Sequence, residues 1–187
     1  MSEPVTALQG ASFDGFARVR EIGPLGMITL RAKAGTKGLD KAVKAALGLA
    51  LPAPRRMVWE GPADAGRGIG WMGPDEFLLV LPHADLPAAL AALEAGLQGS
   101  HYLAVDVSDA RCVFRIEGET ADQVLRKLMP VDFDRLEPGE LRRSRAAQVP
   151  AAIWAGEGGF TLVAFRSVAG YVMGLLSHSA QPGSELN

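Results

Sequence analysis

An α+β fold is predicted by three features of the sequence. Short β-rich stretches alternate with segments whose apolar residues recur every three or four positions, as on one face of a helix. Tight turns join neighbouring strand-like stretches, which favours antiparallel pairing. The same succession of strand, helix, two or three strands and helix occurs twice. Together these features predict two ferredoxin-like halves, in which helices cover one face of an antiparallel sheet.

The first half starts with a strand over 26–33, followed by a helix over 38–52 whose leucine and valine residues repeat at spacing four. A short strand over 55–61 precedes a hairpin with arms 68–72 and 76–82. The second helix is expected to be capped by an aspartate and to carry a leucine stripe, namely Asp85 with Leu86, Leu90, Leu93 and Leu97. A strand over 102–108 ends this half.

The second half opens with a strict alternation over 111–118 that is typical of a half-buried antiparallel strand. Thr120 and Gln123 have capping-box spacing at the start of a short helix that Pro130 terminates. Three strands follow, over 141–149, 150–156 and 160–166. The last helix is expected to be capped by Ser167 and to pack closely on a sheet through Gly170 and Gly174.

These elements define the expected domain organisation. An N-terminal extension covers residues 1–19, and one compact domain covers 20–178. That domain consists of two pseudo-repeated halves, about 20–108 and 109–178, and residues 179–187 form a C-terminal tail.

Composition excludes several classes of function. The 187 residues are 48% hydrophobic and 21% charged, as expected for a globular protein, and the formal net charge is −2. No basic field is available for phosphates, so nucleic acid is not an expected partner. The chain opens without a basic segment or an apolar leader, and its apolar runs are too short for a membrane span. We therefore expect a cytoplasmic protein without a membrane partner.

The residues that usually carry chemistry do not form a recognisable site. The three histidines, His83, His101 and His178, are far apart and lack the spacing of a zinc-binding helix. Cys112, the single cysteine, falls on the apolar face of its strand, where a thiol is usually an inert hydrophobe. No catalytic, cofactor-binding or metal-binding residue is predicted.

The stretch GWMGPDEFLLVLP contains the most suggestive acids, Asp75 and Glu76. They are either a general acid/base pair or part of a hairpin turn. Pro presets a turn and Asp closes it through backbone hydrogen bonds, so turn chemistry is favoured. If the turn needs a positive φ at Gly73, a Gly73→Val change should cost about 1–3 kcal/mol.

Three arginines crowd the segment LRRSRA. At strand period two, Arg143 and Arg145 share one face and Arg142 lies on the other. This arrangement favours a solvated sheet edge or a subunit contact over a phosphate clamp.

Six stretches together resemble the gamma subunit family of heterotetrameric sarcosine oxidase. They are GMITLRAK, GWMGPDEFLLVLP, AVDVSDARCVFRIEG, VLRKLMPVDFD, RRSRAAQVPAAIW and FTLVAFRSVAGYVMGLL, and they span roughly residues 20–178. The resemblance implies a fold like the folate-binding domain of aminomethyltransferases. It also implies a non-catalytic chain that supports the assembly of a larger oxidase.

The resemblance also implies a reaction, partner subunits and cofactors for that oxidase. The complex oxidatively demethylates sarcosine to glycine, with hydrogen peroxide and either formaldehyde or methylene-tetrahydrofolate as products. Its alpha, beta and delta subunits are the expected partners, and they hold FAD, FMN, NAD, tetrahydrofolate and zinc. This chain is expected to bind no cofactor itself.

Two alternatives share the fold: a stand-alone folate-binding one-carbon transferase and a small folate-binding module. Transferases of this kind carry a further C-terminal barrel domain that the 187 residues do not include, and the folate-binding module has a characteristic cysteine motif that the position of Cys112 does not match.

Aromatic side chains concentrate binding energy at the centres of interfaces. We therefore expect Trp71, Phe77 and Trp154 to anchor partner subunits. The alternate strand residues Val113, Thr161, Val163 and Phe165 are expected to be covered, either by the stacking of the two halves or by a partner.

Overall fold

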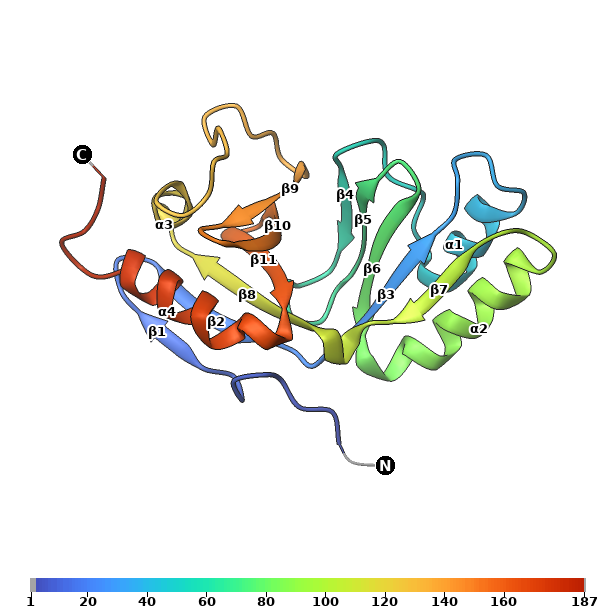
Figure 1. The fold of residues 1–187 in the computed structure, drawn as a ribbon, viewed down its shortest axis with the longest axis horizontal. Helices are drawn as coiled ribbons and strands as arrows, with labels where there is room; N and C mark the ends of the chain where they lie inside the picture. Colours follow the sequence, from blue (N-terminus) through green and yellow to red (C-terminus); the bar gives the residue numbers. More distant parts are fainter. Residues whose placement is uncertain (1–2, 187) are drawn as a thin grey trace. The chain divides into compact units, whose positions relative to one another are not determined.

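Two units make up the chain in the computed structural model, which describes residues 3–186. The inserted unit is Pro24–Ser108, and the split unit combines residues 3–23 with 109–186. In each unit two helices pack on one face of an antiparallel sheet (Figure 1). The boundary between Ser108 and Asp109 coincides with the expected division between the two halves.

The inserted unit has a five-stranded sheet in the order β4-β5-β6-β3-β7. All four strand pairs are antiparallel. Its elements are β3 (Leu25–Arg31), α1 (Leu39–Leu47), β4 (Met57–Glu60), β5 (Arg67–Gly73), β6 (Glu76–Pro82), α2 (Leu86–Leu97) and β7 (Leu103–Asp106).

The core of the inserted unit follows the predicted periodicities. Ile28 and Leu30 on β3 and Leu79 on β6 point to the face that α1 and α2 cover, and all three are fully buried. The helices contribute the predicted stripes, with Leu39, Val43 and Leu47 on α1 and Leu86, Leu93 and Leu97 on α2. Burial of such side chains contributes about 1.5–3 kcal/mol each, so this face is a major source of stability for the inserted unit.

The split unit has a six-stranded sheet in the order β1-β2-β8-β11-β10-β9. Every strand pair is again antiparallel. Its elements are β1 (Ser12–Asp14), β2 (Arg18–Ile22), β8 (Arg111–Glu117), α3 (Ala121–Arg126), β9 (Leu141–Ala146), β10 (Val149–Gly156), β11 (Gly159–Phe165) and α4 (Ala169–Ser179).

The two sheets correspond strand by strand. When β3 is matched with β8, the orders β4-β5-β6-β3 and β9-β10-β11-β8 are equivalent. A helix follows β3 and β6 in the inserted unit, and a helix follows β8 and β11 in the split unit. The next position belongs to β7 in one unit and to β2 in the other. The chain runs from β2 into β3, but β2 pairs with β8 in the sheet of the split unit. In the same way the chain runs from β7 into β8, but β7 pairs with β3 in the sheet of the inserted unit. The prediction of a duplicated ferredoxin-like α+β fold is confirmed.

The N-terminal residues differ from the expected extension. Within 1–19, the described part contains β1 and the start of β2, which pairs with β8 through five residue pairs. The buried Glu21 carboxylate accepts hydrogen bonds from the backbone N–H groups of Leu8 and Gly10. Arg166 donates to the carbonyl oxygens of Val5 and Thr6. This segment is therefore part of the split unit, although residues 1–2 lie outside the described range.

A lysine holds the C-terminal segment. Lys127 Nζ donates to the carbonyl oxygens of Ser179 and Ser184 and to the Ser184 hydroxyl. Leu186 N–H donates to Gln123 Oε1 at 2.7 Å. A cation at the last carbonyl of α4 also complements the helix dipole. Up to residue 186, the expected tail is thus attached to α3 and the end of α4; residue 187 lies outside the described range.

The predicted helix caps are wrong. Asp85, Thr120 and Ser167 provide no side-chain cap hydrogen bond to the helices as described over 3–186. The turns before α2 and α4 are 3₁₀ helices, and their backbone bonds, such as Ala169 N–H to Arg166 O, take the place of side-chain caps. Asp85 instead pairs with Arg67 at 2.7 Å.

The glycines of α4 do not face the sheet as predicted. The buried face of the helix consists of Ala169, Val172 and Leu176. Gly170 and Gly174 each lie one or two positions beyond these residues, so a rotation of 100° per residue places them on the exposed side. A Cβ added at either glycine would meet no atom of the described residues within 4 Å.

Candidate interaction surface

The stretch from Gly70 to Pro82 forms a hairpin, as the sequence predicted. β5 and β6 are joined at Pro74-Asp75, with Gly73 opposite Glu76. The backbone of Gly73 is outside the positive-φ region, and a Cβ there would make only an ordinary contact, 3.8 Å from the Glu76 Cβ. The condition for a costly Gly73→Val change is therefore not met.

The two acids of the hairpin have structural partners. Glu76 Oε2 accepts from Arg31 Nη2 at 3.2 Å, across the β3–β6 pair. The carbonyl oxygen of Asp75 accepts from Ala32 N–H at 3.0 Å. Both contacts tie the hairpin to β3, which agrees with turn chemistry rather than with an acid/base pair.

Cys112 lies in the core of the split unit, as its strand alternation predicted. It is 3% exposed, and its thiol donates to Phe165 O at 3.4 Å. Burial, with a smaller contribution from the charge of Glu21, raises the pKa of Cys112 to about 11. A thiol with this pKa is protonated at neutral pH and is a poor nucleophile.

The histidines do not converge with other ligand types. Across residues 3–186, no group of three His, Cys, Asp or Glu side chains is placed to hold a metal ion. No helix in the same range is long and apolar enough to cross a membrane.

A polar network occupies the face of the split-unit sheet that the helices do not cover. Arg20 donates from Nε and Nη2 to both oxygens of Glu117, at 3.0 and 2.9 Å. Arg115, which is 2% exposed, donates to Thr161 Oγ1 at 3.1 Å and to Glu157 O at 2.7 Å. The hydrogen bonds from Arg20 lower the pKa of Glu117 below its usual value. These hydrogen bonds hold the charged groups of Arg20, Arg115 and Glu117 in place on this face of the sheet.

The arginine-rich segment forms an edge strand, consistent with the predicted edge. β9 is the outermost strand of its sheet, and Arg143 and Arg145 are exposed on one face. Arg142, on the other face, pairs with Glu140 at 3.0 Å. Charged side chains of this kind protect an open edge from pairing with another chain.

The three predicted anchors differ in accessibility. Trp71 and Phe77 lie opposite each other on β5 and β6 and both pack on the core of the inserted unit. Trp71 is half-buried, whereas Phe77 is 5% exposed. Trp154, on β10 of the split unit, is 4% exposed. Only Trp71 keeps enough surface in the folded chain to contact another protein without a rearrangement.

The alternate strand residues expected to need a cover are largely buried by the folded chain itself. Val113, Thr161 and Val163 are each 3% exposed, while Phe165, at the end of β11, is 43% exposed. The Arg111 guanidinium lies 4.2 Å from the centre of the Phe165 ring. Of these four residues, Phe165 is the one with a large exposed surface that a partner can contact.

Besides Phe165, β7 carries exposed apolar side chains that were not predicted from the sequence. Leu103 and Val105 are 51% and 41% exposed and share one face of this edge strand. Ala104, between them, packs on the core from the other face. Leu103 and Val105 alternate with Ala104 and Asp106, and this alternation alone does not show which face is buried. Only the position of β7 at the sheet edge, which the sequence does not encode locally, reveals the exposed pair.

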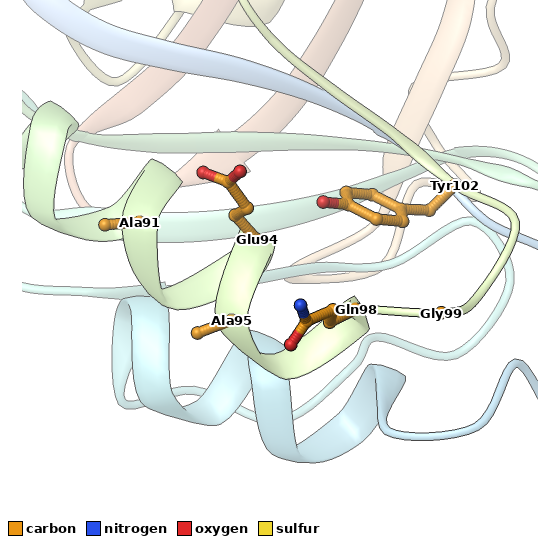
Figure 2. A pocket seen from close by; sticks show the side chains of 6 residues that line it. All are labelled: Ala91, Glu94, Ala95, Gln98, Gly99 and Tyr102. Atoms are coloured by element: carbon orange, nitrogen blue, oxygen red, sulfur yellow. The ribbon is translucent and has the colours of Figure 1, made fainter.

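An open depression of about 440 Å³ lies beside β7, between α2 and the loop that leads from α2 to the strand. Figure 2 shows Glu94 and Gln98 projecting from α2 and the Tyr102 ring extending toward the helix. Small residues leave the space between them. The lining residues are Ala91, Glu94, Ala95, Gln98, Gly99 and Tyr102.

Comparison with solved structures defines the class of protein by its fold. The chain is similar to the glycine cleavage system aminomethyltransferase T from Bartonella henselae, with a TM-score of 0.64 at 16% identity over 87% of this chain and 46% of that one. It is also similar to a chain of the heterotetrameric sarcosine oxidase from Corynebacterium sp. U-96 in complex with pyrrole 2-carboxylate. That TM-score is 0.78, at 28% identity over 90% of this chain and 87% of the other. The fold is that of the aminomethyltransferase-like proteins.

Sequence comparison identifies the family. The model of the sarcosine oxidase gamma subunit family matches residues 31–181. The sarcosine oxidase subunit gamma of Corynebacterium sp. (strain U-96) is 36% identical over 156 residues, which is 79% of this chain and 72% of the relative. The chain belongs to the sarcosine oxidase gamma subunit family.

Proposed function

We propose that the chain is the non-catalytic gamma subunit of a heterotetrameric sarcosine oxidase and supports the assembly of that complex. One observation carries the proposal: the chain matches the gamma subunit family over residues 31–181 and shares its fold, over 90% of its length, with a chain of the solved heterotetramer. The half-buried Trp71 and the exposed Phe165, Leu103 and Val105 support it, because they offer apolar surface to other subunits.

The proposed complex acts in the cytoplasm and converts sarcosine to glycine. Oxidative demethylation transfers electrons to oxygen, giving hydrogen peroxide, and leaves a one-carbon unit as formaldehyde or methylene-tetrahydrofolate. FAD, FMN, NAD, tetrahydrofolate and zinc are assigned to the alpha, beta and delta subunits. The buried, protonated Cys112 and the ion-paired Glu76 support a structural role for this chain, since neither has the free, activated side chain that catalysis needs.

Co-expression with the other three subunits tests the proposal. A tagged chain should retain the alpha, beta and delta subunits through affinity and size-exclusion chromatography, and the isolated complex should release peroxide from sarcosine. The chain purified alone should be colourless and should form no peroxide with sarcosine. Failure of the chain to join the complex, or peroxide formation by the chain alone, would overturn the proposal.

Titration with reduced folate separates this role from that of a folate-dependent transferase or folate-binding module. Such proteins would bind tetrahydrofolate without other subunits, with a dissociation constant in the range of about 1 μM. We expect no saturable change in intrinsic tryptophan fluorescence when tetrahydrofolate is added to the isolated chain. Micromolar binding by the chain alone would favour the folate-binding alternative.

A further inference from the structure

The outer edge of β7 presents backbone groups that can accept another strand. Val107 N–H donates to Met27 O at 2.8 Å, on the side of β3. Antiparallel pairs alternate in the direction of their backbone groups, so those of Leu103 and Val105 also face β3. The N–H and C=O groups of Ala104 and Asp106 therefore point away from the sheet.

This edge lacks the protection that β9 has. The exposed side chains of the edge strand β9 include Arg143 and Arg145, whereas those of the edge strand β7 include Leu103 and Val105. Arg31, which lies opposite Leu103 on β3, is paired with Glu76 at 3.2 Å. On this face the exposed side chains of β7 itself are the apolar Leu103 and Val105, beside Thr29 and Arg31 of β3. Unprotected apolar edges are the sites at which a segment of another chain adds a strand.

The opposite face of the same edge has acidic and aromatic character. Glu94 is the single charged residue that lines the depression beside Tyr102. Residues 86–106 contain two acids, Glu94 and Asp106, and no lysine or arginine. A carboxylate, an amide and an aromatic ring around one open space are the groups that recognise a guanidinium or ammonium ion.

We propose that β7 is the docking site for an extended segment of another oxidase subunit, which adds a sixth strand to the sheet of the inserted unit. Side chains of an added strand alternate between the two faces. One set contacts Leu103 and Val105 and is apolar. The other set faces α2 and places an arginine or lysine between Glu94 and Tyr102.

Charge decides between this occupant and a second copy of the chain. A symmetric β7–β7 pairing would bring Glu94 and Asp106 of both copies to the same seam, where like charges repel. A basic segment of a different subunit has no such penalty. The inference rests on the proposed function, because it names how the chain contacts its complex.

Three variants of the full-length chain test the inference, by measuring affinity for a preparation of the other oxidase subunits. Glu94→Arg reverses the charge in the depression, and Ala104→Pro removes an outward N–H without loss of a bond to β3. Glu119→Arg is the matched control, since Glu119 is an exposed acid of the split unit. We expect the first two to weaken binding about tenfold or more and the control to bind like the wild type.

The outcomes distinguish the inference from the proposed function. If the wild type assembles and both edge variants bind as it does, the β7 inference is wrong while the subunit assignment stands. If the wild type does not assemble, both fail. A chain that forms homodimers, which Ala104→Pro abolishes, would overturn the assignment of this edge to a different subunit. Glu94 lies on the exposed side of α2, so Glu94→Arg keeps the test valid if Ala104→Pro does not fold.

Discussion

Cys112 is a thiol whose reactivity the fold suppresses. Burial in the core of the split unit raises its pKa to about 11, so the thiolate is scarce at pH 8. We predict that the native chain does not react with a disulfide reagent such as DTNB at this pH, and that one equivalent reacts after unfolding in guanidinium. Rapid stoichiometric reaction of the folded chain, followed by absorbance, would contradict the burial of this residue.

Glu117 links stability to pH. The hydrogen bonds from Arg20 depress the pKa of its carboxyl in the folded state. The resulting stability is present above the unfolded pKa, about 4.3 for a glutamate, and is lost as the pH falls through the folded value. Glu117→Gln should therefore lower the free energy of unfolding by about 1 kcal/mol at neutral pH, a value typical of partly exposed pairs, and by less in acid.

Urea denaturation at several pH values measures this difference. Glu119→Gln is the control, because Glu119 is exposed and removal of its charge should change stability little at any pH. An equal loss for Glu117→Gln at neutral and acidic pH would show that packing, and not the ion pair, is responsible.

At the scale of elements, α4 is less stable than its length allows. Gly170 and Gly174 face away from the core, with no atom of the described residues near the position of an added Cβ. Glycine within a helix costs about 0.8–1 kcal/mol relative to alanine. We predict that Gly170→Ala and Gly174→Ala each raise the free energy of unfolding of the isolated chain by about 0.5–1 kcal/mol. Thermal denaturation that shows destabilisation by both changes would mean that this face is packed.

The helices and hairpins show which elements local sequence can predict. The apolar stripes of α1 and α2 were predictable because their spacing already matches a helix, and the hairpin at Pro74-Asp75 because proline and aspartate favour a turn. The caps expected at Asp85 and Ser167 were not predictable, because the 3₁₀ turns before α2 and α4 replaced the side-chain bonds with backbone bonds. The sequence does not show which face of α4 packs on the sheet, so it could not predict that Gly170 and Gly174 lie on the exposed side.

The whole molecule depends on its N-terminal residues. β2 lies between β1 and β8 in the sheet, pairs with β8 and contributes the fully buried Val19 to the core of the split unit. We predict that a chain of residues 24–187 aggregates or loses β structure, as measured by circular dichroism and size-exclusion chromatography. A chain that lacks only residues 1–4 should remain folded, because the contacts of Val5 and Glu21 are retained. A folded, monomeric 24–187 chain would contradict this structural role of β2.

The sequence by itself determined the fold class, the duplicated order of elements, the family and the burial of Cys112. These follow from local periodicity and from motif order, which are properties of neighbouring residues. The tertiary structure alone decided that β2 completes the sheet of the split unit, that Arg115 is buried and that β7 is an open edge beside Glu94 and Tyr102. The physical reason is that strand partners and exposure depend on contacts between residues far apart in the chain. The four residues of β7, LAVD, would have the same local pattern at the centre of a sheet as at its edge.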